Sequence, residues 1–299
     1  MVMKADSLKK SLLLFLAALI WGVAFVAQSE AVGLVEPFTF NCVRNILGSI
    51  VLLPVIYVMG RCRKETDKAE ISGKATVVGG ILCGVVLGTA SALQQIGIEY
   101  TTAGKAGFIT AFYIVLVPVA GIFLKKKCGL NVWISVLLAI TGLGLLCLKD
   151  DFSVGKGEIY VFLCAIMFTI HILVIDHFGA KADSVKMSCI QFATVGVLSG
   201  IVMLIFEKPD LGNILKAWLP IVYTGVFSSG VAYTLQIVGQ KGMNPTVASL
   251  ILSLESVVSV IAGFIILKQE LSGRELLGCV VMFAAIILVQ LSPAKDNKK

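Results

Sequence analysis

Ten apolar runs, each close to the length of a membrane-crossing helix, constrain this chain more than any other feature. A helix rises about 1.5 Å per residue, so about 20 residues cross a hydrocarbon core of about 30 Å. Only 14% of the residues are charged, against about 25% in soluble domains. We therefore expect an all-α membrane protein with ten transmembrane helices rather than a soluble enzyme, a disordered chain or a secreted disulfide scaffold. The predicted segments are 11–29, 37–58, 75–97, 104–124, 131–148, 158–176, 186–206, 218–239, 245–267 and 275–292.

The basic residues predict the orientation of these segments. If the N-terminus is cytoplasmic, most of the 25 Lys and Arg residues fall on that side, including Lys9, Arg61 and the run 125–127. Such a bias marks cytoplasmic loops. We therefore expect a multi-pass protein of the bacterial plasma membrane with both termini cytoplasmic. No basic face with interleaved aromatic residues is visible, so we expect no nucleic-acid partner.

The two halves of the chain resemble each other. Leu93–Gly97 reads L-Q-Q-I-G, and Leu235–Gly239 reads L-Q-I-V-G at the equivalent place in the second half. We therefore predict two units, 1–150 and 151–299, with five helices each. Because five is odd, the second unit enters the membrane from the opposite side. Inverted repeats of this kind are typical of alternating-access transporters, whose substrate site lies near the midplane between the repeats.

The order and spacing of several short motifs resemble the EamA family of the drug/metabolite transporter superfamily. The matching positions are Ala18–Phe25, Arg44, Ala92–Val119, Leu254–Val260 and Gly263 with Glu270. The resemblance covers nearly the whole chain. It implies a bundle of two inverted five-helix repeats that exports small metabolites such as amino acids. The chain departs from the family at Glu255–Ser256, where Glu-Pro is frequent.

Glu255 is the only acidic residue placed deep in a predicted helix. It lies ten residues after Pro245, which at about 1.5 Å per residue is about 15 Å into the membrane. Polar residues at that depth are costly and are functional candidates. A carboxyl group there can bind a proton or a substrate ammonium, or it can hold neighbouring helices together. We predict substrate binding and proton coupling for Glu255, and substrate binding for Tyr113 at the equivalent position of the first repeat.

Other side chains at similar depth are candidates for the wall of a substrate site. Gln94 and Gln236 can supply hydrogen bonds to a solute, or they can be ordinary contacts between membrane helices. Aromatic residues on one helix face suit an amphipathic solute, although packing against lipid is the alternative. The predicted substrate-binding residues are Trp21, Phe25, Gln94, Tyr113, His171, Tyr233, Gln236 and Glu255.

Arg44 and Gln191 occupy equivalent positions in the two halves. Arg44 lies seven residues after Pro37, about 10 Å below the outer face. It can meet a substrate carboxylate, or it can bond to groups elsewhere in the bundle. The shared position favours a structural role for both residues.

Absent motifs narrow the function. The sequence has no H-E-x-x-H, no phosphate-binding loop, no catalytic Ser/His pattern and no Cys/His set with metal spacing. We therefore expect no catalytic residues, no metal and no cofactor. We predict a secondary transporter that exports small organic metabolites, amino-acid-like or amphipathic, by alternating access. The alternatives are an intramembrane enzyme that modifies lipids or isoprenoids, which needs paired acids, and a non-transporting membrane partner or receptor.

Overall fold

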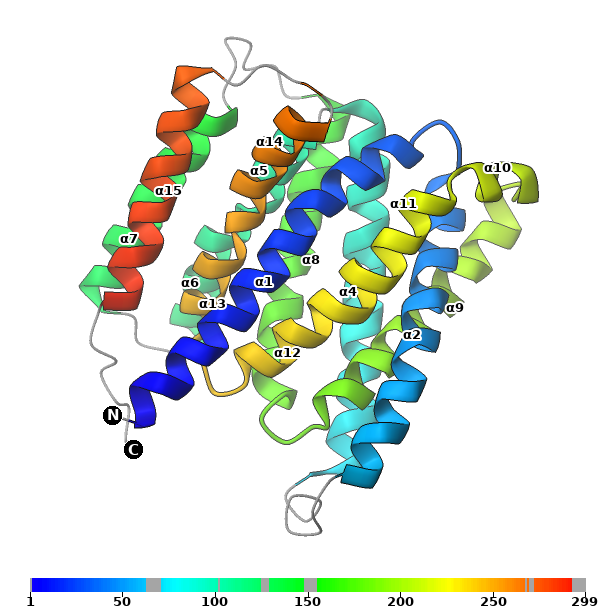
Figure 1. Cartoon of the computed structure of the whole chain (residues 1–299), viewed down its shortest axis with the longest axis horizontal. Helices are drawn as coiled ribbons and strands as arrows, with labels where there is room; N and C mark the ends of the chain where they lie inside the picture. Colours follow the sequence, from blue (N-terminus) through cyan, green and yellow to red (C-terminus); the bar gives the residue numbers. More distant parts are fainter. Residues whose placement is uncertain are drawn as a thin grey trace.

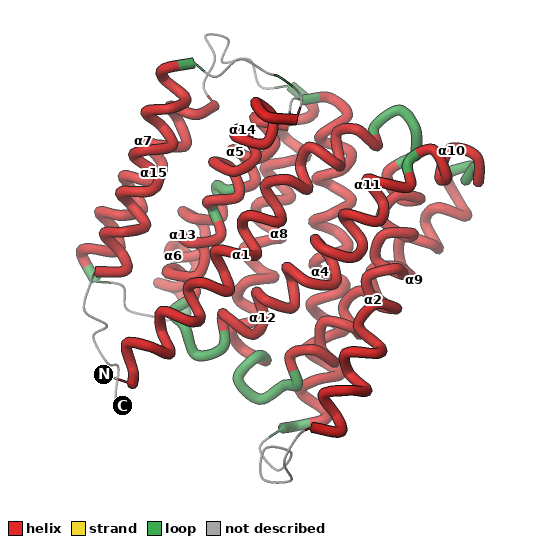
Figure 2. The backbone as a smooth tube through the Cα atoms, in the orientation of Figure 1, coloured by secondary structure: helices red, strands yellow, loops and turns green. Residues whose placement is uncertain are grey.

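The computed structural model describes residues 2–62, 71–101, 103–124, 129–147, 155–266, 268 and 272–291. Within these ranges the chain is helical and contains no strand (Figure 2). The predicted boundary between residues 150 and 151 lies outside the described residues. The helices of the first half are α1 (Val2–Ala31), α2 (Pro37–Cys62), α4 (Gly73–Tyr100), α5 (Ala103–Thr110), α6 (Tyr113–Phe123) and α7 (Leu130–Cys147). Those of the second half are α8 (Lys156–Phe178), α9 (Ser184–Phe206), α10 (Leu211–Lys216), α11 (Trp218–Val222), η1 (Tyr223–Tyr233), α12 (Thr234–Gln240), α13 (Pro245–Leu252), α14 (Leu254–Ile266) and α15 (Gly273–Leu291).

The expectation of an all-helical membrane protein is confirmed. Among the described residues, eight helical stretches are long and apolar enough to cross a membrane. Two shorter apolar helices, Leu130–Gly142 and Leu276–Leu288, overlap the fifth and tenth predicted segments but are shorter than the eight candidate spans. The eight candidate spans are Ser7–Ala31, Pro37–Arg61, Gly73–Tyr100, Ala106–Phe123, Lys156–Phe178, Ser184–Phe206, Trp218–Gln240 and Pro245–Ile266.

Side-chain caps fix the ends of several helices. Asp183 accepts a hydrogen bond from the Lys186 amide at the start of α9. Glu207, at the other end of α9, caps a different helix, because its carboxylate accepts the Thr39 amide at 2.6 Å and the Phe38 amide at 2.8 Å. The first amides of a helix have no partner within the helix, and a carboxylate satisfies them and favours the positive end of the helix dipole. Glu207 therefore ties the start of α2 to the end of α9.

Two of the membrane spans are each broken once, at matching places. A turn at Ala111 and Phe112 separates α5 from α6, and Ser253 separates α13 from α14. Ala111 precedes Tyr113 by two residues, as Ser253 precedes Glu255. The breaks therefore place these two polar side chains at the start of α6 and in the first turn of α14.

A third span contains a π-helix. The eleven residues of η1 lie between α11 and α12, with Pro220 just before them. The wider π-helical turn is rare, and it often occurs at functional sites. Here it carries Ser228 and Tyr233 toward the middle of the bundle.

Glycines bring α4 and α9 close together. A Cβ at Gly84 would lie 2.5 Å from Cβ of Thr194 and 2.7 Å from the Gln191 carbonyl oxygen, and a Cβ at Gly80 would lie 2.8 Å from Cβ of Ile190. No real side chain fits at such distances. The small residues therefore set the spacing of these helices, as they commonly do in membranes.

The two halves of the chain pack against each other through many helix pairs. The main contacts join α2 to α9, α7 to α15, α4 to α8 and α9, and α1 to α14, η1 and α12. Figure 1 shows α7 and α15 side by side at one edge of the bundle. The centre of the bundle therefore lies between elements of both halves.

Candidate functional site

A cavity lies among elements of both halves of the chain. Its wall combines aromatic and aliphatic side chains with a small number of polar groups, a composition typical of small-molecule sites. It contains one guanidinium and one carboxyl group. The lining residues are Trp21, Ala24, Phe25, Gln28, Arg44, Gln94, Tyr113, Phe168, Ile172, Ser228, Tyr233, Gln236, Leu252 and Glu255.

A hydrogen bond between Tyr113 and Glu255 joins the two broken spans at this cavity. The Tyr113 hydroxyl donates to Oε1 of Glu255 at 2.9 Å, and the two side chains are only 3% and 5% exposed. Nearby, the Ser256 hydroxyl donates to the Gly107 carbonyl oxygen at 3.0 Å and links α14 to α5. The contact therefore joins two residues that are predicted to be equivalent in the two halves of the sequence.

Arg44 brings a guanidinium group to the cavity from α2. One guanidinium nitrogen, Nη1, donates to Oε1 of Gln28 at 3.2 Å, and the guanidinium carbon lies 5.2 Å from the centre of the Phe40 ring. Gln28 in turn donates to the Ala24 carbonyl oxygen at 3.3 Å. No carboxylate of the described residues forms an ion pair with Arg44. Within the described part of the chain, the guanidinium is therefore held by an amide and an aromatic face.

Aromatic rings form one wall. The Trp21 and Tyr233 ring centres lie 4.5 Å apart and the rings are tilted by 56°, a favourable geometry for an aromatic pair. The indole Nε1 donates to the Ser228 carbonyl oxygen at 3.4 Å, which ties α1 to η1. Phe192 supports Tyr233 from behind, with ring centres 5.7 Å apart. This wall gives the cavity an aromatic, largely apolar side.

The two glutamines of the repeated L-Q-x-x-G motif both line the cavity but differ in their bonding. Gln94 donates to the Thr110 hydroxyl at 3.2 Å. Oε1 of Gln236 has no hydrogen-bond partner among the described residues, although the side chain is buried. Gln236 therefore has a side-chain acceptor without a partner among the described residues, whereas the amide of Gln94 is already partly engaged.

His171 is the one predicted substrate-binding residue that does not line the cavity. Its ring lies edge-on to Tyr233, with centres 5.8 Å apart, and it is fully buried. Nε2 of His171 lies 2.8 Å from Oε1 of Gln191, whereas Nδ1 of His171 and Nε2 of Gln191 have no partner within the described residues. This pair therefore backs the aromatic wall.

Replacing one member of the His171–Gln191 pair is expected to cost more stability than replacing both. His171→Phe leaves the Gln191 amide buried without a bond, which costs about 1–3 kcal/mol, whereas paired apolar groups of similar shape are nearly neutral. We expect His171→Phe and Gln191→Leu each to lower the melting temperature, and the double variant to recover most of the loss. Thermal unfolding of the purified variants measures this. Additive losses in the double variant would contradict a coupled pair.

Some residues that line the cavity are not predicted from the sequence to bind substrate. Leu252 lies one turn before Glu255, so helical spacing alone indicates it. Ser228 contributes through η1, and a π-helical stretch changes which residues share a face, so regular helical spacing does not indicate it. Arg44 was predicted to be structural, and its position in the wall follows from the close packing of α2 against η1, where a Cβ at Gly48 would lie 2.8 Å from Cβ of Ser229.

The described residues contain no group of three or more His, Cys, Asp or Glu side chains that could hold a metal ion. The chemistry available in the cavity is therefore hydrogen bonding, one positive and one acidic group, and apolar contact. Such an arrangement suits the binding of a small organic solute.

The chain is similar to known transporters over most of its length. The model of the EamA-like transporter family matches residues 8–148 and again 155–291. An uncharacterized transporter of Archaeoglobus fulgidus is 28% identical over 279 residues, covering 93% of this chain and 84% of that protein. A WAT1-related chloroplastic protein of Arabidopsis thaliana is 24% identical over 289 residues, covering 92% and 68%.

A solved crystal structure has the same fold. Its TM-score with this chain is 0.77 at 17% sequence identity, and the match covers 94% of this chain and 96% of the other. The family match extends over nearly all of the sequence, and its relatives are named as transporters. The chain therefore belongs to the EamA-like transporter family and is a multi-pass membrane transporter of small molecules rather than an enzyme.

Proposed function

We propose that this transporter exports an amino-acid-like or amphipathic metabolite across the bacterial plasma membrane by alternating access. The observation that carries the proposal is the Tyr113–Glu255 hydrogen bond, which joins two broken helices at the wall of a polar and aromatic cavity. Broken helices at the midplane, at the interface of two repeats, are how many secondary transporters build their sites.

Ten crossings in two inverted repeats form part of the proposal. Its support is the exchange symmetry of the contacts: α4 packs on α8 as η1 and α12 pack on α1, and α4 packs on α9 as η1 packs on α2. The breaks before Tyr113 and Glu255 match as well. The family model matches residues 8–148 and 155–291 separately, which agrees with a division into two repeats near residue 150.

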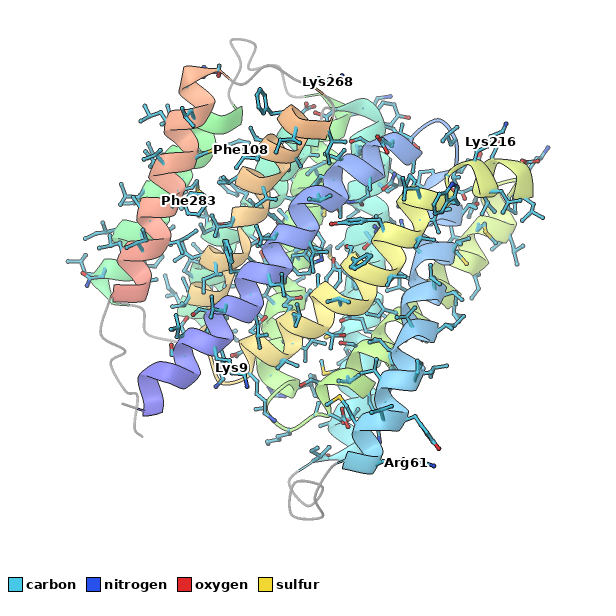
Figure 3. All side chains as sticks on the ribbon, in the orientation of Figure 1. Lys9, Arg61, Phe108, Lys216, Lys268 and Phe283 are labelled. Atoms are coloured by element: carbon cyan, nitrogen blue, oxygen red, sulfur yellow. The ribbon has the colours of Figure 1, made fainter. Side chains whose placement is uncertain are left out.

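Both termini are proposed to be cytoplasmic. In Figure 1, α1 begins and α15 ends toward the same side of the molecule. Figure 3 shows Lys9 and Arg61 near that end of the bundle, and Lys216 and Lys268 near the other. The end that carries Lys9 and Arg61 is the one with the larger share of basic residues in the sequence, so it faces the cytoplasm by the positive-inside rule.

Glu255 is proposed to couple export to protons. A carboxyl group holds one proton or one cationic group of a solute at a time, so the two compete for the same oxygens. If a proton enters from outside and solute enters from the cytoplasm, this competition drives exchange of one for the other. Tyr113 keeps one oxygen of the carboxyl group hydrogen-bonded throughout the cycle.

The change of access is proposed to occur at the irregular parts of the bundle. The breaks at Ala111 and Ser253 and the π-helix η1 interrupt the helical hydrogen-bond ladder next to the cavity. Hinges are few residues that absorb backbone changes while packed elements move as bodies. The tightly packed α4–α9 contact would then move as one unit.

Transport in vesicles of known orientation tests the proposal. Everted membrane vesicles expose the cytoplasmic face, and they are loaded with protons by a pH gradient, acidic inside. We expect a pool of labelled amino acids to accumulate in everted vesicles that contain the protein and not in vesicles without it. A protonophore should abolish the accumulation. Uptake confined to right-side-out vesicles would contradict export, and accumulation that survives the protonophore would contradict proton coupling.

A further inference from the structure

Among the described residues, the guanidinium of Arg44 is a buried positive charge without a negative partner. The side chain is only 5% exposed. Besides Gln28, it contacts the face of Phe40, and its Nε has no hydrogen-bond partner among the described residues. Buried charges in proteins are normally paired, because removing a lone charge from water is costly. The side chain is therefore under-satisfied where it lines the cavity.

The carboxyl group in the same cavity does not supply the missing partner. Glu255 is bonded to Tyr113 and makes no ion pair with Arg44. Contacts along α1 place the two groups at different levels: Gly22 lies against the Glu255 backbone, and Gln28 bonds to Arg44. Six residues of helix separate Gly22 from Gln28, which is about 9 Å.

A second unpartnered group lies beside Arg44. Asn41 is fully buried, and neither its Nδ2 nor its Oδ1 has a hydrogen-bond partner within the described residues. Asn41 and Arg44 are three residues apart on α2, so they are neighbours on its surface. Nδ2 of Asn41 and Nε of Arg44 are thus two unused donors on one face of a helix.

We propose that Arg44 is the anion-binding residue of the cavity and that the transported solute carries a carboxylate. This inference rests on the proposed function and names the chemistry of its substrate. A guanidinium matches a carboxylate with two parallel hydrogen bonds, a geometry that a lysine ammonium cannot reproduce. The proposal gives Arg44 a binding role instead of the structural role predicted from its shared position. Its counterpart Gln191 contacts His171 and does not line the cavity. The positive charge at this position therefore comes from the first half of the chain alone.

The inference is tested by a fluorescence titration that reports on the cavity itself. The chain has 3 tryptophans, of which Trp21 lines the cavity, so Trp133→Phe with Trp218→Phe leaves a single reporter. The purified protein is titrated with three pools: free amino acids, the same amino acids as amides, and simple carboxylic acids. The amide pool lacks the carboxylate, and the carboxylic-acid pool lacks the ammonium. Everted-vesicle flux is measured in parallel.

A preference for carboxylates that depends on Arg44 is the expected result. Hydrogen bonds to a charged group correspond to roughly a 10- to 100-fold change in affinity, so we expect free acids to bind at least about tenfold more tightly than amides. Arg44→Gln should reduce that ratio to about two or less, and Arg44→Lys should leave an intermediate preference. Lys216→Gln, which removes a positive charge on exposed α10, controls for general electrostatics. If Arg44→Gln does not fold, Arg44→Lys and the unsubstituted comparison carry the test.

The possible results separate this inference from the proposed function. Three results would overturn the role of Arg44. The first is equal binding of free amino acids and their amides, and the second is binding of neither free amino acids nor simple carboxylic acids. The third is a preference for carboxylates that is undiminished in Arg44→Gln. If solute flux in everted vesicles persisted in those cases, the exporter proposal would stand without this inference. Binding of amino acids but not of simple acids would support the inference and identify an amino acid as the solute. Binding of simple acids alone would support it with an organic acid as the solute.

Discussion

Glu255→Gln is expected to slow pH-driven accumulation of solute in everted vesicles strongly while leaving the protein folded. The amide of glutamine still accepts the Tyr113 hydroxyl through its carbonyl oxygen, so the link between α6 and α14 persists. The amide cannot take up a proton at physiological pH, so the competition between proton and solute is lost. Charge-assisted hydrogen bonds of the carboxyl group correspond to roughly a 10- to 100-fold effect, and we expect at least about a tenfold loss in gradient-driven rate.

The matched control for this variant is Tyr113→Phe. It removes the hydroxyl but keeps the carboxyl group that we propose to carry the proton, so it should change the apparent affinity for the solute and retain the response to a pH gradient. Solute-for-solute exchange without a gradient is measured on both variants, and size-exclusion profiles check folding. Accumulation by Glu255→Gln at the unsubstituted rate would remove Glu255 from the coupling mechanism.

Much of this architecture is predictable because the membrane restricts what a chain can do. Backbone groups in lipid must bond internally, so each long apolar run becomes a helix. Polar side chains are costly to bury in these helices, so Glu255, Gln94 and Gln236 are functional candidates from sequence alone. All three line the cavity. Trp21 is predicted from a different pattern, aromatic residues on one helix face, and it also lines the cavity.

Other features depend on three-dimensional packing that periodicity does not encode. The π-helix η1 brings Ser228 to the cavity, and no propensity rule distinguishes it from the α-helix on either side. His171 has the expected depth, but it packs edge-on against Tyr233, and only Tyr233 lines the cavity. The position of Arg44 depends on which helix faces the first turns of α2. The depth of a polar residue along its predicted helix therefore indicates that it is a candidate for the site. Which groups it contacts depends on the packing of the neighbouring helices.

Exchanging Tyr113 and Glu255 is the sharpest test of the repeat relationship. The two residues stand at equivalent positions, 142 residues apart, and they bond to each other. If the repeats are inverted as proposed, two equivalent positions that touch lie near the axis that relates them. The double variant Tyr113→Glu with Glu255→Tyr therefore restores a tyrosine opposite a carboxyl group, with the two helices interchanged.

Each single variant should lose thermal stability and pH-driven transport that the double variant largely or partly keeps. Tyr113→Glu places two carboxyl groups together in a buried site, and Glu255→Tyr leaves two phenols with no acidic group. We expect both to lose stability by about 1–3 kcal/mol and to lose pH-driven transport, because a buried polar group without its partner carries its full desolvation cost. The double variant should recover most of the thermal stability and part of the pH-driven transport, since both residues lie in the first turn of their half-helix. A double variant no more stable than the worse single variant would mean that the two positions are not interchangeable, and that the likeness between the repeats ends short of the site.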